Sequence, residues 1–266
     1  MNRPWLEPPD DATMRRAAAL LEPWRRLVDP VFLGLDRIPD DRPLLFVGNH
    51  TLYGVLDAPL MYMALYFRKG IFLRSLGDRM HFRIPIWGHT LSRFGAIEGS
   101  PDTCSQLMQD NQCILVFPGG AREVAKRRGE HYQLVWGERA GFARLAIEHG
   151  CTIVPFAAVG AEDMFDIIAD ANDVLRSPLG SLWKRLNLRE DFLPPLALPR
   201  VRSLNRVERF YFRFMDPIRT ADVRGSTDPD VIWSIREQTR AAIEAGIVEL
   251  MEHREADPRR YIETQP

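Results

Sequence analysis

The sequence predicts an α/β fold, a single domain in which helices flank a mostly parallel central sheet. Short apolar runs typical of buried strands alternate with segments of helical periodicity between residues 44 and 159. This alternation favours parallel strands, because a helical crossover returns the chain to the same end of the sheet. The length of 266 residues and a hydrophobic content of 45% suit one large domain with a sizeable core.

Each element has its own signals. The expected strands cover residues 44–47, 71–73, 93–97, 113–117, 151–159 and 210–214, and the expected helices cover residues 12–27, 58–67, 102–111, 141–149 and 228–255. Pro23 should kink or break the first helix, whereas Asp57 is a good N-cap and Gly150 a good C-cap. Residues 78–86 are predicted to be a linker.

Three parts are expected along the chain. An N-terminal helical segment covers residues 1–39, the main domain covers residues 40–256, and a frayed tail covers residues 257–266. No run of about 20 apolar residues occurs, so no membrane-spanning helix is expected. Residues 1–11 carry proline and acid, which is not the pattern of a signal peptide.

Composition argues against several classes of function. The formal net charge of −1 provides no general field that would attract nucleic acid. Cys104, Cys113 and Cys151 lack metal-ligand spacing and cannot all pair, which indicates reduced thiols in the cytosol. His81 and His89 have no cysteine or acid nearby to complete a metal site, so no metal is expected.

One stretch has the residues of a general-base site. His50 comes directly after a buried apolar run, and Asp57 stands where the next helix begins. Histidine titrates near neutrality, and a carboxylate bonded to its other ring nitrogen would orient the ring and stabilise the imidazolium. Residues seven apart on one helix are separated by roughly 10 Å, so this pairing requires residues 51–55 to form a loop, which Gly54 permits. The alternative is that His50 ends a strand and Asp57 only caps a helix.

A second stretch has the residues of an anion or oxyanion site. The strand over residues 113–117 runs into Pro118-Gly119-Gly120-Ala121-Arg122-Glu123. Paired glycines allow backbone N–H groups to converge on a negative charge, and Arg122 could bind a phosphate or carboxylate. Lys126, Arg127 and Arg128 follow closely and could contact a diphosphate. The alternative is an ordinary turn with a solvated Arg122–Glu123 pair.

Two segments could touch a membrane. Residues 12–27 form a basic amphipathic helix with Trp24, and residues 164–200 mix apolar groups with a tryptophan and basic residues. Such segments can lie on an anionic bilayer or, in the second case, rim an acyl pocket. The alternative for both is packing against the domain.

Four motifs in order resemble the glycerolipid acyltransferase superfamily. They are Gly48-Asn49-His50 with Asp57, then Arg93-Phe94-Gly95-Ala96-Ile97-Glu98-Gly99-Ser100, then Val116-Phe117-Pro118-Gly119-Gly120-Ala121-Arg122-Glu123, then Ile153-Val154-Pro155-Phe156. The Pro-Gly-Gly-x-Arg-Glu form, the His-x6-Asp spacing and the later Trp136-x2-Arg139-x-Gly141-Phe142-Ala143 look closest to the diacylglycerol acyltransferase-like and phytyl ester synthase-like branch. The resemblance runs from about residue 40 to residue 220 and implies a glycerolipid acyltransferase-like fold for the main domain.

The chain departs from the commoner pattern of that superfamily. Six residues instead of four separate His50 from Asp57, Gly119 replaces a glutamate, Ala121 replaces a threonine, and Gly99 replaces an arginine. The resemblance therefore implies catalytic roles for His50 and Asp57 more directly than acceptor-binding roles. The substrate-binding residues it implies are Asn49, Phe94, Pro118, Gly119, Gly120, Arg122 and Glu123.

The implied function is an O-acyltransferase of lipid metabolism, in glycerolipid or phospholipid biosynthesis. It would move a fatty acyl group from acyl-CoA or acyl carrier protein to a lipid alcohol, with no cofactor beyond that co-substrate. His50 would take the hydroxyl proton, Asp57 would orient His50, and N–H groups near Gly119 and Gly120, or near Asn49, would stabilise the oxyanion. The expected location is cytoplasmic, peripheral on the inner face of a membrane.

The expected acceptor is neutral, such as diacylglycerol or a long-chain alcohol. A phosphate dianion needs paired cations, yet Gly99 and Glu98 stand where the phosphate-using relatives carry an arginine, and Glu123 could neutralise Arg122. Three alternatives stay open. They are a lysophospholipid acyltransferase in which Arg93, Lys126 or Arg127 supplies the charge, a thioester or ester hydrolase, and a catalytically silent lipid-binding protein.

Overall fold

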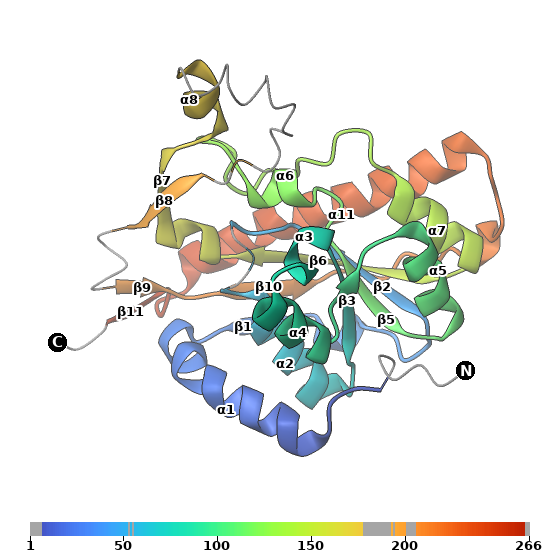
Figure 1. Cartoon of the computed structure of the whole chain (residues 1–266), viewed down its shortest axis with the longest axis horizontal. Helices are drawn as coiled ribbons and strands as arrows, with labels where there is room; N and C mark the ends of the chain where they lie inside the picture. Colours follow the sequence, from blue (N-terminus) through green and yellow to red (C-terminus); the bar gives the residue numbers. More distant parts are fainter. Residues whose placement is uncertain are drawn as a thin grey trace.

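The computed structural model describes residues 7–52, 54, 56–177, 193, 195–200 and 206–263. A seven-stranded sheet forms the centre of the molecule, in the order β1-β10-β6-β2-β5-β3-β4 (Figure 1). Its strands are β1 (Val31–Leu33), β2 (Leu44–Gly48), β3 (Leu73–Gly77), β4 (Ile97–Glu98), β5 (Cys113–Val116), β6 (Thr152–Val159) and β10 (Tyr211–Phe214). All neighbours pair in parallel except β10 with β6. The predicted α/β fold with a mostly parallel sheet is confirmed.

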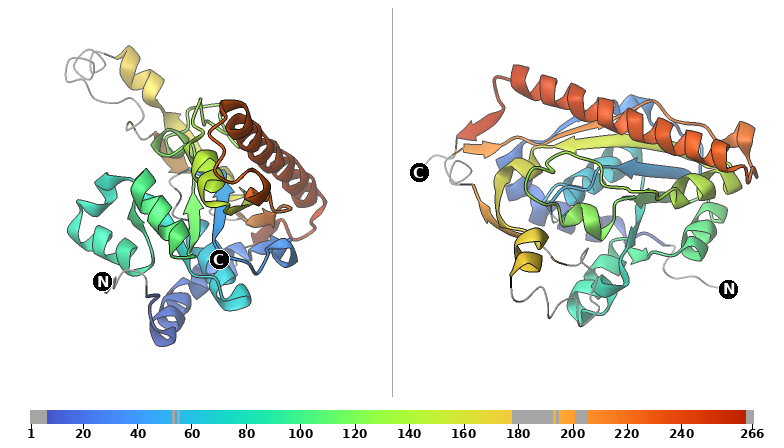
Figure 2. Two further views of the ribbon diagram at one scale, coloured as in Figure 1. Left: turned by 90° about the vertical axis from the view of Figure 1, so that its right-hand side faces the viewer. Right: turned by 90° about the horizontal axis from the view of Figure 1, so that it is seen from above.

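Helices cover both faces of the sheet (Figure 2). Alternate residues of β2 point to opposite sides. Leu45 and Val47 pack in one apolar cluster with α5 (Pro101–Gln109), α7 (Gly141–His149) and α11 (Pro229–Ala256). Leu44 and Phe46 pack in a second cluster with α1 (Asp11–Val28) and α2 (Ala58–Lys69). Because both faces are covered, β2 is buried along its whole length, as its unbroken apolar run predicts.

The remaining elements are short. They are α3 (Arg79–Phe82), α4 (Pro85–Arg93), α6 (Ala121–Val124), α8 (Ala171–Arg176), the 3₁₀ turns η2 (Leu35–Arg37), η3 (Ala161–Met164) and η5 (Ala221–Val223), and two small antiparallel pairs, β7 (Phe165–Ala169) with β8 (Leu196–Pro199) and β9 (Arg206–Glu208) with β11 (Tyr261–Glu263). Much of the mixed segment 164–200 falls outside the described residues, and the described parts are β7, α8 and β8.

Several sequence-based expectations are wrong in detail. Residues 78–86 are not a linker, because Asp78 caps α3 and Pro85 opens α4. The expected tail does not fray between residues 257 and 263, since β11 pairs with β9. The N-terminal segment contributes β1 to the central sheet, and α1 continues through Pro23 without a break. The predicted caps at Asp57 and Gly150 are confirmed.

The end of β2 is shaped by an aromatic ring from β6. Gly48 pairs with Phe156, and a Cβ atom added at Gly48 would lie 2.3 Å from Cζ of that ring. Only glycine leaves room for the phenyl group there, so β2 ends against an aromatic wall. The chain then turns out of the sheet at the point where β2, β5 and β6 all finish, which is where α/β sheets bind ligands.

Candidate active site

A small cavity lies at this end of the sheet. Its polar lining comes from the loop after β2, namely Asn49, His50, Thr51 and Asp57, together with Gly54. Its apolar walls are Met61 of α2, Phe117 after β5, and Phe156 and Phe212 of β6 and β10. The structure therefore brings His50 and Asp57, predicted from the sequence, to one cavity with aromatic walls.

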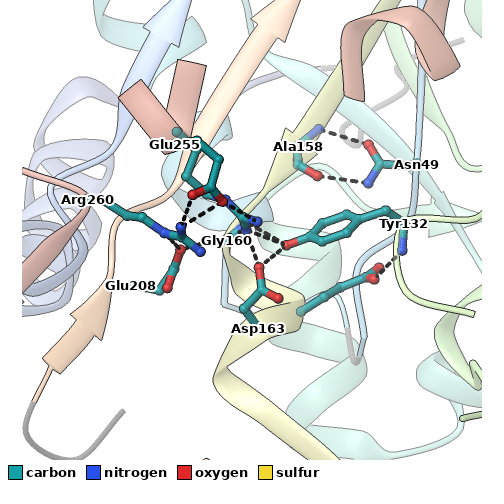
Figure 3. Close-up of polar contacts among 10 residues, drawn as sticks. Asn49, Tyr132, Ala158, Gly160, Asp163, Glu208, Glu255 and Arg260 are labelled. Atoms are coloured by element: carbon teal, nitrogen blue, oxygen red, sulfur yellow. Dashed lines mark hydrogen bonds and ion pairs between the residues drawn. The ribbon is translucent and has the colours of Figure 1, made fainter. Parts of the chain in front are cut away.

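Asn49 holds the loop to the neighbouring strand. Its side-chain Nδ2 donates to the carbonyl oxygen of Ala158 at 2.9 Å, and its Oδ1 accepts from the N–H of Ala158 at 2.8 Å (Figure 3). Asn49 is buried, and this paired contact extends the β2–β6 ladder by a side chain. One N–H group and the oxygen of the amide are engaged with the backbone of β6, so the Asn49 side chain fixes the loop that lines the cavity.

The imidazole of His50 is held on two sides. Its Nδ1 lies 3.0 Å from the carbonyl oxygen of Thr51, a contact that places the proton on Nδ1 and leaves Nε2 as the acceptor. The ring packs 4.2 Å from the Phe117 ring, between centroids, and a Cβ atom on Gly54 would lie 2.0 Å from its Cε1 atom. Burial lowers the pKa of His50 to about 4, and the charges of Lys126 and His81 act in the same direction. The ring is therefore neutral at pH 7, the form that can accept a proton.

Asp57 is joined to His50 through Thr51. The Thr51 hydroxyl donates to Oδ1 of Asp57 at 2.9 Å, and the same oxygen accepts from the Ala58 N–H at 2.8 Å. Among the described residues no hydrogen bond joins His50 directly to Asp57, so the predicted direct pair is replaced by a contact through one residue. Asp57 is buried, and burial raises its pKa. Thr51 was not among the residues predicted from the sequence, where its signal is a hydroxyl residue directly after the histidine.

The glycine loop after β5 follows Phe117, which lines the cavity, whereas Pro118, Gly119 and Gly120 are not among the described lining residues. The Gly120 N–H donates to the carbonyl oxygen of Phe117 at 2.9 Å and is not available for an oxyanion. Within the described chain, the Gly119 N–H has no intramolecular acceptor. The guanidinium of Arg139 donates to the carbonyl oxygens of Pro118 and Gly119, so both carbonyl groups point toward Arg139.

The cations near this loop are bonded to acids of the same chain. Arg122 makes a two-pronged contact with the carboxylate of Glu130, and not the pair with Glu123 that the sequence left open as an alternative. Lys126 is buried in an ion pair with Glu162. The other two residues of the basic cluster also have partners within the chain, because Arg127 bonds Asn172 and Arg128 bonds Asp170 and Asp173.

Glu123 lies under the glycine loop. Its side chain is fully buried, and a Cβ atom added at Gly119 would lie 2.3 Å from its Oε2 and 2.5 Å from its Cβ. The backbone N–H groups of His50 and Val135 act to lower the pKa of its carboxyl group. Neither carboxylate oxygen has a hydrogen-bond partner among the described residues. Burial raises the pKa of Glu123 to about 7, despite the opposing charge of Lys126. Glu123 therefore fills the space that a side chain at position 119 would take.

A buried polar network supports the other side of the loop. Glu162 accepts from Lys126 and from the Tyr132 N–H. The Tyr132 hydroxyl donates to Asp163 and accepts from the Gly160 N–H (Figure 3). Arg254 of α11 also donates to Asp163. The network ties the loop after β5 to the end of β6 and to α11.

The second predicted motif lies away from the cavity. Phe94 caps the C-terminus of α4 and is not part of the cavity lining. Glu98 bonds Arg79, and the Gly99 N–H bonds the Gly77 carbonyl. The described residues contain no group of three or more histidines, cysteines or acids that could hold a metal ion. The three cysteines are buried, and burial raises the pKa of Cys104 to about 12, which makes it a poor nucleophile.

The chain is similar to acyltransferases. The family model described as Acyltransferase matches residues 30–159. Phytyl ester synthase 1, chloroplastic, of Arabidopsis thaliana is 31% identical over 86% of this chain and 35% of its own length. The human DGAT1/2-independent enzyme synthesizing storage lipids is 32% identical over 46% of this chain and 37% of its own length. The chain thus spans about a third of the length of the curated relatives it matches.

A solved structure shows the same fold. The 1-acyl-sn-glycerophosphate (LPA) acyltransferase PlsC from Thermotoga maritima matches with a TM-score of 0.50 and 14% sequence identity, over 91% of this chain and 84% of that chain. The family model and the curated relatives confirm the predicted resemblance to the glycerolipid acyltransferase superfamily, and the solved structure shows the same fold.

The contact between Gly119 and Glu123 predicts a stability effect. Gly119→Ala should lower the free energy of unfolding by about 1–3 kcal/mol, because its Cβ would overlap the Glu123 Cβ, which no rotamer change can move. Urea unfolding measures the loss, with Gly141→Ala as the matched control because that position in α7 has open space. The cost should shrink in a Glu123→Gly background, because that substitution removes the Cβ that the added methyl group would meet. An equal cost in both backgrounds would contradict the contact.

The burial of His50 predicts a displaced pH profile. The neutral ring is the active form, so kcat/KM should fall as the pH drops through the pKa of about 4, well below the ordinary value of about 6.5. Phe117→Ala admits water to the ring and should move this acid limb upward. Circular dichroism at each pH separates inactivation from unfolding. A wild-type activity that falls at a pH near 6.5 would contradict the burial of His50. Because Glu123 has a raised pKa of about 7, Glu123→Gln shows whether a fall in that range belongs to Glu123 instead.

Proposed function

We propose that this protein transfers a fatty acyl group from a thioester, acyl-CoA or acyl carrier protein, to the hydroxyl group of a neutral lipid alcohol. The observation that carries the proposal is the neutral imidazole of His50, with Nε2 as acceptor, in a cavity walled by Phe117 and Phe156. Such a site can deprotonate a hydroxyl group next to an apolar chain.

His50 acts as the general base in this reaction. Its Nε2 takes the proton of the acceptor hydroxyl as that oxygen attacks the thioester carbonyl carbon. The imidazolium so formed then gives the proton to the departing thiolate, which returns the ring to its neutral state. Asp57 stabilises the imidazolium electrostatically and fixes the loop through Thr51, whose carbonyl oxygen orients the ring.

The tetrahedral intermediate needs a donor for its oxyanion. The Gly119 N–H is our candidate, because it lies in the loop that also holds Phe117 and has no acceptor among the described residues. Neighbouring Gly120 spends its N–H on Phe117 and is a poorer candidate.

A neutral acceptor fits the charges around the loop. A phosphate dianion would have to compete with Glu130 for Arg122 and with Glu162 for Lys126, which is buried. Breaking a buried ion pair leaves an uncompensated charge and costs about 3–5 kcal/mol. The relatives named for phytyl esters and for storage lipids agree with a long-chain or glycerolipid alcohol as acceptor.

We also propose peripheral association with the inner face of a membrane, on the cytoplasmic side, as the place of this reaction. A lipid alcohol partitions into bilayers, so the enzyme must reach their surface. No helix in the described part of the chain is long and apolar enough to cross a bilayer.

The mechanism predicts graded losses of turnover. His50→Ala should lower kcat by about 10² to 10⁴, and Asp57→Asn should also lower it strongly. Thr51→Val should reduce kcat because the bond to Asp57 is lost, whereas Thr51→Ser keeps the hydroxyl and should stay near wild type. Steady-state kinetics with labelled acyl-CoA and a long-chain alcohol measures these effects. Folded His50→Ala with near-normal transfer would refute the mechanism.

The acceptor assignment predicts the outcome of a competition. Diacylglycerol, a long-chain alcohol and lysophosphatidic acid are offered together with one labelled acyl-CoA, and mass spectrometry counts the esters. We expect the neutral alcohols to be preferred, and Arg122→Gln to leave that preference unchanged. A preference for lysophosphatidic acid that vanishes in Arg122→Gln would reverse the assignment. Labelled free fatty acid formed without any alcohol would identify a hydrolase instead.

A further inference from the structure

The surface formed by α3 and α4 is unusually apolar. Met80, Ile84, Ile86 and Trp87 are 53%, 56%, 85% and 38% exposed, and they fall within eight consecutive positions. They make up four of the eleven large hydrophobic residues found exposed in the described chain. Single exposed apolar residues are common, whereas a contiguous group indicates an interaction surface.

The way α4 packs turns these side chains outward. Gly88 is the one buried residue of this nine-residue helix. A Cβ atom at Gly88 would lie 2.9 Å from Cα and 3.0 Å from the carbonyl oxygen of Phe82, so α4 meets α3 through a glycine against backbone. Ile86 and Trp87, which come just before Gly88 in this helix, are therefore left exposed and are accessible to a partner outside the chain.

The charges on this surface select the kind of partner. Residues 78–93 contain three arginines, Arg79, Arg83 and Arg93, and a single acid, Asp78. All three arginines are exposed, although Arg79 is bonded to Glu98, and Asp78 is engaged as the cap of α3. Exposed apolar side chains that share a short segment with exposed arginines match the two attractions of an anionic bilayer, which are insertion and charge.

This surface acts electrostatically on the catalytic histidine. The charge of His81 in α3 acts in the direction that lowers the pKa of His50, and Trp87 of α4 donates to Nδ1 of His81 at 3.2 Å. Among the described residues that line the cavity, none belongs to α3 or α4.

We propose that α3 and α4 dock the protein on an anionic lipid bilayer, the source of its lipid acceptor. This surface differs from the two expected from the sequence, the α1 region and residues 164–200. The inference rests on the proposed function for the identity of the acceptor, and on the exposed residues of α3 and α4 for the docking itself.

Vesicle binding tests the surface. Wild type is floated with vesicles of phosphatidylcholine and phosphatidylglycerol and with phosphatidylcholine alone, at low and high salt. Ile84→Ser/Ile86→Ser should weaken binding to the anionic vesicles by about tenfold or more, since two apolar side chains no longer insert. Arg83→Gln should reduce binding mainly at low salt. Leu20→Ser is the matched control, because Leu20 on α1 is 84% exposed and Ile86 is 85% exposed.

Two acyl acceptors separate docking from catalysis. The double variant should lose activity on a long-chain alcohol embedded in vesicles and keep activity on a short-chain alcohol dissolved in water. If the double variant binds vesicles weakly as predicted while wild type transfers no acyl group to either alcohol, the result would support the docking surface and contradict the proposed function. Unchanged vesicle binding by the double variant, or loss of binding in Leu20→Ser instead, would overturn the surface proposal. A dimer of wild type in light scattering that is absent in the double variant would also overturn the surface proposal, because the partner of this surface would then be a second copy of the chain.

Discussion

The candidate site depends on the paired hydrogen bonds between the Asn49 side chain and the backbone of Ala158. They join the first residue after β2 to β6, the neighbouring central strand, and both strands are buried along their whole length. Each buried hydrogen bond contributes about 1 kcal/mol, and leaving either backbone group unsatisfied would cost about 1–3 kcal/mol. His50 follows immediately, so its ring is positioned by the sheet and not by a flexible loop. The contacts of the imidazole with Thr51, Gly54 and Phe117 then need only fix its rotation.

The charged side chains around the site form ion pairs that hold its loops in place. Arg122 with Glu130 and Lys126 with Glu162 hold the loop after β5, and the Tyr132 network ties that loop to α11. Because these groups neutralise one another, they add little field to the cavity beyond the effects of Lys126 on His50 and Glu123. The walls can then remain aromatic and dry, which keeps the imidazole uncharged. An acyl chain and a neutral alcohol suit such a cavity better than a phosphate does.

The sequence predicts the parts of the structure that have strong local signals. The strands β2, β5 and β6 are unbroken apolar runs, and Asp57 and Gly150 mark helix ends, so these elements were identified. The three-residue strands β1, β9 and β11 have no such signal, because they exist only through partners far away in the chain. For the site, the sequence identified His50 and Asp57, and the structure brings both to one cavity. It could not reveal that Glu130 instead of Glu123 bonds Arg122, because the choice depends on the path of the loop in space.

The pairing of β1 with β10 has a consequence for synthesis on the ribosome. Val31 lies opposite Tyr211, so about 180 further residues must leave the exit tunnel after the first strand before it can meet its neighbour. The helix that covers β6 and β10, α11, emerges later still. Until then one edge of the nascent sheet and the apolar face of β6 are uncovered. Long-range pairing of this kind slows folding and leaves apolar surface exposed to aggregation. A chaperone that binds the growing chain until α11 is made would protect this surface.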